Sequence, residues 1–195
     1  MTRNTTTTWG WAAILLHWVG AALIVVLLAH GWWMTHLAPR PERGLNYAWH
    51  AAVGYDFLAL LIIRLLWRWA NPVPALPQDL RPWERYAAQL GHIGLYLLMF
   101  AAALSGWALA GTGRTAFRQD LFGVTVPMVY TDRSAHGLLE DTHWTLSYLL
   151  AVLVLVHVVG ALRHHYVKHN TILRRMLVGV KPANPQERAP ERQRA

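Results

Sequence analysis

His143 and His157 lie fourteen residues apart in one long apolar segment of the 195-residue chain. If the segment is an α-helix, fourteen residues turn through about 1400°, within about 40° of whole turns, and rise about 21 Å. The two imidazoles then share one helix face at two depths. Each depth could hold a haem if a facing helix supplied a second axial histidine. His17 and His50 are the candidates for that role.

Four apolar stretches of the chain must position these histidines. Each is long enough to cross the roughly 30 Å hydrocarbon layer of a membrane, and Trp and Tyr cluster at their ends. The chain is 54% hydrophobic and only 14% charged, less charged than a soluble bundle of this size would be. We therefore predict an all-α integral membrane four-helix bundle. Its helices are expected at about residues 11–34, 47–70, 88–110 and 143–166.

The distribution of positive charge predicts how the bundle is oriented. If the N-terminus is cytoplasmic, thirteen of the eighteen Lys and Arg residues fall on the cytoplasmic side. The positive-inside rule then predicts an up-down-up-down topology with both termini in the cytoplasm. The five on the other side are Arg40, Arg43, Arg114, Arg118 and Arg133. No nucleic-acid-binding motif accompanies the charge, so nucleic acid is not an expected partner.

In this topology the four histidines form two pairs by depth. His17 and His157 lie near the cytoplasmic side, whereas His50 and His143 lie near the opposite side. An ionisable residue within a membrane span is costly unless it faces the bundle interior and finds a partner there. Two sites for non-covalently bound haem b are therefore predicted, each with two axial imidazoles.

The same fourteen-residue interval leads to two glycines. Gly31 follows His17 on the first helix, and Gly106 follows His92 on the third. Without a side chain, each position would let a haem macrocycle pack against the backbone. Glycine is also common in membrane helices, so a purely structural role is the alternative.

Fourteen residues after His50 comes Arg64, which would face the same seam near the cytoplasmic surface. A guanidinium there could pair with a haem propionate, or could simply extend to the interface. His30 lies thirteen residues from His17, about 220° round the helix, and is expected to face away from the site.

Other metal chemistries are weaker alternatives. The chain has no cysteine, which excludes disulfides, Cys-ligated iron–sulfur clusters and covalent c-type haem. Zinc also accepts imidazole, but it takes three or four protein ligands together, and each predicted pair supplies two. A histidine-lined metal or proton transporter is a further alternative. Asp56 is an acid within a span, yet it lies about 240° round the helix from His50.

The remaining segments divide the chain into two parts. Residues 1–177 are expected to form the transmembrane domain, and residues 178–195 a basic, disordered cytoplasmic tail, because that tail has little apolar content. The connection at 111–142 is long enough to be a lid or docking surface, although a loop that merely packs against the bundle is an equally good interpretation.

Several short motifs of the chain resemble the bacterial cytochrome b561 family over about residues 10–177, most closely its superoxide oxidase type. The motifs are Leu16-His17-Trp18, Trp49-His50 with Arg64, Gly91-His92-Ile93-Gly94, Phe122-Gly123-Val124-Thr125-Val126-Pro127, His164-His165-Tyr166 and Asn170-Thr171-Ile172-Leu173-Arg174. The resemblance implies a multi-pass di-haem protein of the bacterial inner membrane, with axial ligands at His17, His50, His143 and His157. It also implies ubiquinone as electron acceptor.

The resemblance further implies an oxidoreductase that takes electrons from superoxide and passes them to ubiquinone. Superoxide would be attracted by arginines on the non-cytoplasmic side, Arg114, Arg118 and Arg133 among them. Four cytoplasmic-side residues are candidates for the quinone region: His92, Arg68, Arg81 and His164. The alternative within redox chemistry is a haem b subunit that carries electrons between a partner dehydrogenase or hydrogenase and the quinone pool.

Overall fold

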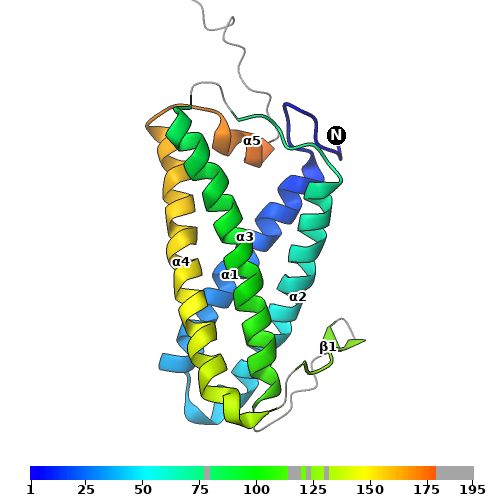
Figure 1. Ribbon diagram of the computed structural model, residues 1–195, viewed down its shortest axis with the longest axis vertical. Coiled ribbons are helices and arrows are strands. Elements are labelled where there is room, and N and C mark those ends of the chain that lie inside the picture. Colours follow the sequence, from blue (N-terminus) through cyan, green and yellow to red (C-terminus); the bar gives the residue numbers. More distant parts are fainter. Residues whose placement is uncertain (77–79, 114–119, 122–123, 130–131, 179–195) are drawn as a thin grey trace, which may run out of the picture.

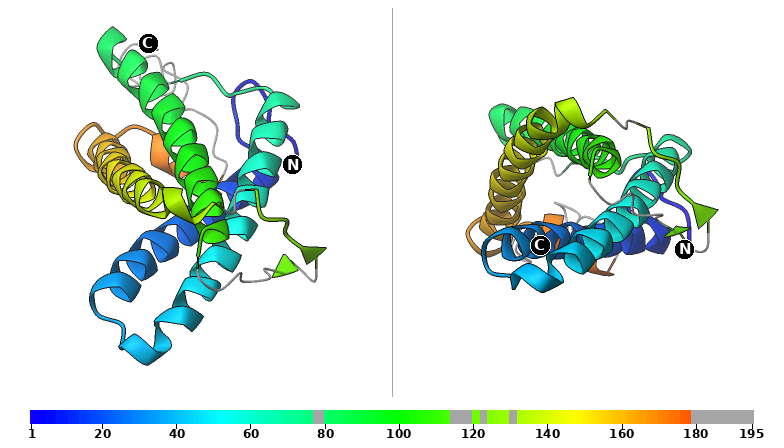
Figure 2. Two further views of the ribbon diagram at one scale, coloured as in Figure 1. Left: turned by 60° about the horizontal axis from the view of Figure 1, so that its bottom comes forward. Right: turned by 90° about the horizontal axis from the view of Figure 1, so that it is seen from below.

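Four long helices form the protein. The computed structural model describes residues 1–76, 80–113, 120–121, 124–129 and 132–178. The helices that are long and apolar enough to span a membrane are α1 (Trp11–His36), α2 (Arg43–Trp69), α3 (Pro82–Gly111) and α4 (His136–Tyr166). They pack as one bundle, with α1 beside α2 and α3 beside α4 (Figures 1 and 2). The predicted all-helical class with four membrane-length helices is confirmed.

The shorter elements lie at the two ends of the bundle. They are the 3-10 helices η1 (Arg40–Glu42) and η2 (Arg133–Ala135), the strands β1 (Asp120–Leu121) and β2 (Val124–Thr125), and the helix α5 (Ile172–Val178). The two strands, of two residues each, pair antiparallel. The sequence did not predict them. Most of the predicted tail, from residue 179 onward, lies outside the described residues.

Three helices begin earlier than predicted. α2 starts at Arg43 instead of 47, α3 at Pro82 instead of 88, and α4 at His136 instead of 143. The prediction followed the apolar segments, and a helix continues past the hydrocarbon layer wherever its backbone hydrogen bonds can be satisfied. At α3, proline suits the first turn, and a Glu84 carboxylate oxygen accepts a hydrogen bond from the Arg81 amide at 3.1 Å.

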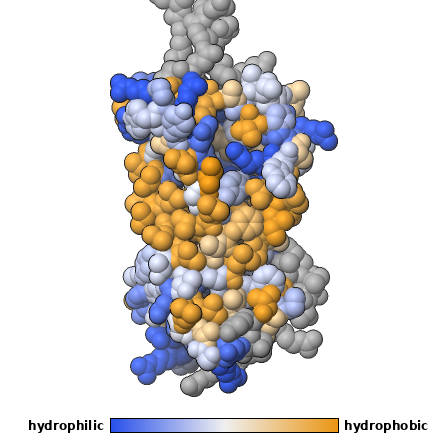
Figure 3. Space-filling view, viewed as in Figure 1, coloured by the Kyte–Doolittle hydropathy of each residue, from blue (hydrophilic) through white to orange (hydrophobic). Residues whose placement is uncertain are grey.

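A narrow interior core holds the helices together, and most apolar side chains face outward. The core residues are Ile24, Leu27, Phe57, Leu61, Leu95, Met99, Ala102 and Leu150. Within α1, α2 and α3 they recur at three- or four-residue spacing, which places them on one face of each helix. Figure 3 shows a hydrophobic band across the middle of one face of the bundle, with hydrophilic residues above and below it. A bilayer would cover this band.

Three segments cover one end of the bundle, and we call them the terminal cap: residues 1–10, residues 70–76 and α5 (Figure 1). Arg175 joins all three, because its guanidinium donates hydrogen bonds to the carbonyl oxygens of Ala75 at 2.9 Å and Thr7 at 2.8 Å. The Trp18 indole donates to the Met176 carbonyl at 2.7 Å, which ties the cap to α1 beside His17.

Replacing Arg175 with methionine is expected to destabilise the protein by about 1 to 3 kcal/mol, because the Thr7 and Ala75 carbonyls lose their buried donor. Arg175 is 3% exposed, whereas its neighbour Arg174 is exposed. Arg174→Met is therefore the matched control. Thermal unfolding of the two variants in detergent measures the difference, and equal midpoints would contradict a stabilising role for the Arg175 bonds.

Candidate functional site

The structure brings the four predicted histidines together in two pairs. The ring centres of His17 on α1 and His157 on α4 lie 6.4 Å apart, with an angle of 70° between the ring planes. The ring centres of His50 on α2 and His143 on α4 lie 6.3 Å apart, with ring planes at 80°. α4 therefore contributes one imidazole to each pair, as the fourteen-residue spacing predicted.

Both separations fit a metal ion held between two imidazoles. With metal–nitrogen bonds of about 2 Å, the centres of two rings on opposite sides of one ion lie about 6 Å apart. In the part of the chain that the structure describes, no group of three or more His, Cys, Asp or Glu side chains is arranged to hold a metal ion. A two-imidazole site suits haem iron, whose other ligands come from the macrocycle, and does not suit zinc.

His143 is oriented by hydrogen bonds from α3. Its Nδ1 lies 2.9 Å from the Ala102 carbonyl oxygen and 3.3 Å from Ser105 Oγ. A carbonyl oxygen only accepts, so Nδ1 carries the proton and Nε2 is left with a lone pair for a metal. Metal-binding histidines are commonly held in this way. Sequence reasoning missed both partners, although a serine one residue before Gly106 in an apolar span was a usable signal.

Gly31 and Gly106 make room for the imidazoles of one pair. A Cβ atom at Gly31 would lie 3.1 Å from His50 Cε1, and a Cβ atom at Gly106 would lie 2.9 Å from His143 Cε1. We expected a macrocycle to pack at these glycines. The groups nearest to them in the structure are the histidine rings, because the helix crossings bring each ring against the backbone of its neighbour.

His30 contacts the site, and the expectation that it faces away from it is wrong. Its ring stacks on His50, with centres 5.9 Å apart and planes at 15°, and its centre is 4.5 Å from the Trp49 ring. Among the described residues, Nδ1 of His30 and Nδ1 of His50 are buried without a hydrogen-bond partner. The prediction compared His30 with His17 on the same helix, whereas the contact depends on where α2 crosses α1.

At the other pair, Arg64 contacts the imidazole of His17. Arg64 Nη2 lies 2.8 Å from His17 Nδ1, and the guanidinium carbon lies 5.7 Å from the centre of the Tyr96 ring. Gly20 lies beside Arg64, since a Cβ there would make an ordinary van der Waals contact with Arg64 Nη1 at 3.8 Å. The ring of His92 on α3 is 5.4 Å from that of His157. Arg64 and His92 therefore join the His17/His157 pair.

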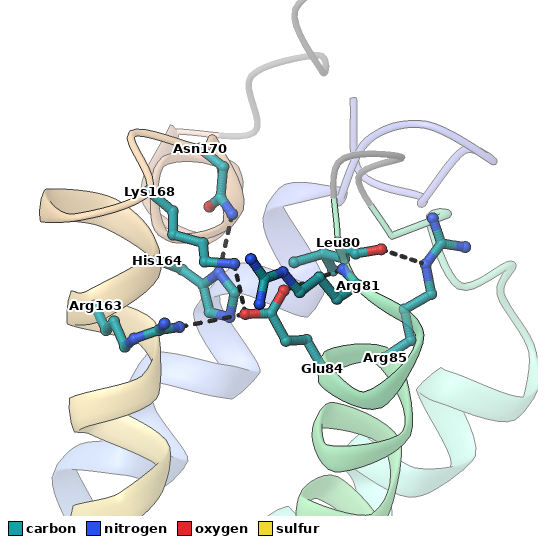
Figure 4. Close-up of polar contacts among 8 residues, drawn as sticks. All are labelled: Leu80, Arg81, Glu84, Arg85, Arg163, His164, Lys168 and Asn170. Atoms are coloured by element: carbon teal, nitrogen blue, oxygen red, sulfur yellow. Dashed lines mark hydrogen bonds and ion pairs between the residues drawn. The ribbon is translucent and has the colours of Figure 1, made fainter.

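The other predicted site residues are more dispersed. Arg68 is partly buried in the last turn of α2, and Arg133 is exposed at the start of η2. Arg81 and His164 lie in a polar cluster between the ends of α3 and α4, around Glu84 (Figure 4). The predicted superoxide-attracting residues Arg114 and Arg118 lie outside the described residues.

Comparison with known proteins places this geometry in a family. A family model described as prokaryotic cytochrome b561 matches residues 8–179. Cytochrome b561 homolog 2 of Escherichia coli K12 is 31% identical over 89% of this chain and 93% of the relative. Cytochrome b561 homolog 1 of the same organism is 28% identical, over 84% and 93%. A protein of Yersinia pestis named probable superoxide oxidase CybB is 29% identical, over 83% and 91%. The chain belongs to the prokaryotic cytochrome b561 family of membrane proteins, which bind haem b and transfer electrons.

Proposed function

We propose that this protein is a di-haem b oxidoreductase of the bacterial inner membrane that oxidises superoxide and reduces ubiquinone. One observation carries the two-haem part: the two histidine pairs have ring centres 6.4 and 6.3 Å apart and share α4. The likeness to a protein named probable superoxide oxidase supports superoxide as the donor. Ubiquinone rests on the motifs that resemble the superoxide oxidase type.

In this proposal His17 and His157 bind one haem, and His50 and His143 bind the other. The Ala102 carbonyl holds His143 in the tautomer that a ligand needs. Gly31 and Gly106 have no side chain that would collide with the His50 and His143 rings, so the rings can keep the positions that bring them together. Haem b, when bound, supplies the one-electron chemistry between a one-electron donor and a two-electron acceptor.

The bundle is proposed to cross the membrane up-down-up-down with both termini in the cytoplasm. Two contacts support antiparallel α1 and α2, since Gly20 lies beside Arg64 and Gly31 lies beside His50. The terminal cap is then cytoplasmic, and the His50/His143 pair lies toward the periplasm. The transmembrane domain comprises residues 1–177, and residues 178–195 are its cytoplasmic tail.

Superoxide is proposed to react on the periplasmic side, attracted by Arg133 together with Arg114 and Arg118 of the same connection. Each superoxide loses one electron and becomes dioxygen. One ubiquinone takes two such electrons and two protons to become ubiquinol. Among the four residues considered for the quinone region, His92 is favoured over Arg68, Arg81 and His164 because its ring lies 5.4 Å from that of His157.

An assay of the isolated full-length protein tests this function. The protein is given a soluble ubiquinone and an enzymatic source of superoxide, and ubiquinol formation is followed spectroscopically. We expect ubiquinol to form above the uncatalysed rate, and added superoxide dismutase to suppress it because it removes the donor. A rate no higher than that of the haem-free protein would refute the proposal.

The second candidate function is a haem b subunit for a partner redox enzyme. The names of the two Escherichia coli relatives say only cytochrome b561 homolog, which fits an electron-transfer subunit as well as an enzyme. Trp107 on α3 donates a hydrogen bond to the Pro127 carbonyl at 2.9 Å, which holds this part of the connection between α3 and α4 against the bundle. We propose that a partner would dock there. Ubiquinone reduction that occurs only with a partner dehydrogenase or hydrogenase present would favour this function.

Arg64→Gln is expected to lower the midpoint potential of the haem at His17/His157 by some tens of millivolts. The guanidinium is a partly buried positive charge beside this ligand, and its removal favours ferric iron, which carries one more positive charge. Spectroelectrochemical titration measures both haems, and the haem at His50/His143 is the internal control. Equal shifts of both potentials would contradict a local effect of Arg64.

A further inference from the structure

A buried carboxylate joins the ends of α3 and α4. The side chain of Glu84, in the first turn of α3, is only 2% exposed. It accepts contacts from Arg163 Nη1 at 3.3 Å, in the last turn of α4, and from Lys168 Nζ at 2.6 Å, two residues after the end of α4 (Figure 4). We call Glu84, Arg81, Arg163 and Lys168 the α3–α4 ion cluster.

Local structure holds these groups in position. Pro82 and the Glu84 contact with the Arg81 amide define the start of α3. After α4 the chain turns at His169, which has a positive φ of 51°, and Asn170 follows it, buried. Asn170 Nδ2 lies 3.0 Å from His164 Nδ1, so the next element begins directly beside the cluster. The local fold therefore places Glu84 next to the segment that carries Lys168.

The cluster carries more positive than negative charge. Arg163 and Lys168 both pair with the carboxylate of Glu84, and Figure 4 shows the Arg81 side chain directed toward the same space. The Arg163 and Lys168 side chains are 47% and 24% exposed, so solvent and solutes reach them. Guanidinium and ammonium groups carry more N–H donors than one carboxylate oxygen accepts. Neighbouring cations are stabilised by a second anion, and a phosphate fits their donors well.

The surface beside the cluster is apolar. An exposed stripe on α4 comprises Leu155, Val159, Leu162 and Tyr166. Their spacing places them on one helix face, about 70° round the helix from Arg163. A ligand that satisfies both surfaces has an anionic head and a long apolar chain.

We propose that the α3–α4 ion cluster binds the phosphate of one anionic phospholipid, whose acyl chain lies along the α4 stripe. Basic sites between helices near the cytoplasmic surface are suited to such headgroups. The headgroup takes the N–H donors of Arg163 and Lys168 that the Glu84 carboxylate does not use. This site does not depend on which donor or acceptor the haems serve.

Lipid binding to the delipidated holoprotein tests the proposal. Native mass spectrometry compares the binding of phosphatidylglycerol with that of phosphatidylcholine. We expect the anionic lipid to bind more tightly, and Arg163→Gln and Arg81→Gln each to weaken it about five- to tenfold. Arg174→Gln, which removes an equal charge from an exposed position on α5, is the control and is expected to leave binding within about twofold of the wild type.

The Glu84→Gln variant distinguishes a cluster that binds lipid from one whose side chains only pair with one another. If the cations bind lipid, this variant keeps its preference for phosphatidylglycerol, because it retains all three cations. Three outcomes would overturn the proposal: no preference between the two lipids, equal losses in Arg163→Gln and Arg174→Gln, or loss of the preference in Glu84→Gln. Saturation of the site by inorganic phosphate at millimolar concentration, with no added lipid required, would also overturn it in favour of a soluble anion.

Discussion

Replacing His50 or His157 with alanine is expected to reduce the haem content from about two per polypeptide to about one. Each variant removes one imidazole of a pair whose ring centres lie 6.3 or 6.4 Å apart, and leaves the other pair intact. The haem content per polypeptide of the purified variants, measured as the pyridine haemochrome, gives the answer. His36→Ala changes an exposed histidine outside both pairs and is the control.

The loss should also be specific to one spectral component. His50→Ala and His157→Ala are expected to remove different haems, which redox titration and low-temperature spectra distinguish. His30 makes a sharper comparison possible, since its ring stacks on His50 at 5.9 Å. If His50→Ala kept two haems and the double variant with His30→Ala lost one, the assignment of His50 as the ligand would be wrong.

Gly106→Ala is expected to have nearly as large an effect, although it adds a single methyl group. Its Cβ would lie 2.9 Å from His143 Cε1, and a shift of the ring away from it would break the contact of His143 Nδ1 with the Ala102 carbonyl. The displaced imidazole should lose the haem of the His50/His143 pair, giving about one haem per polypeptide. Overpacking of this kind typically costs about 1 to 3 kcal/mol.

Gly91→Ala on the same helix is the matched control. Apart from its chain neighbours and the nearby backbone of its own helix, nothing lies within 4 Å of the Cβ position at Gly91, so the methyl group has room there. Alanine favours helix over glycine by about 1 kcal/mol at both positions, so a difference between the variants reports the contact with His143. If Gly106→Ala retained both haems and both potentials, the close approach would have no role in holding the ligand.

Much of the architecture could be predicted because the bilayer simplifies the problem. Four spans follow from segment length and composition, since a membrane-crossing backbone must satisfy its own hydrogen bonds. The pairs His17/His157 and His50/His143 follow from helix periodicity and depth. Arg64 could be assigned to the His17 end by the same interval, and the structure puts it 2.8 Å from His17 Nδ1.

The contacts between helices could not be predicted in this way. His30 illustrates the reason, because its angle relative to His17 on α1 carries no information about where α2 crosses. The Ala102 carbonyl of α3 contacts His143 of α4, and no property of the alanine side chain indicates this bond. The terminal cap depends on Arg175, which the sequence presents as one of many basic residues near the C-terminus.

The sequence by itself determined the membrane class, the number of spans and the depths of the four histidines, because these depend on hydrophobicity and on the regular rise and turn of single helices. Only the tertiary structure decided which backbone lies against which ring, as at Gly31 with His50 and Gly106 with His143. It also decided that Glu84 pairs with Arg163 of α4 and with Lys168, which follows that helix. These contacts depend on the rotation and crossing of neighbouring helices, which side-chain packing sets and which no single helix encodes.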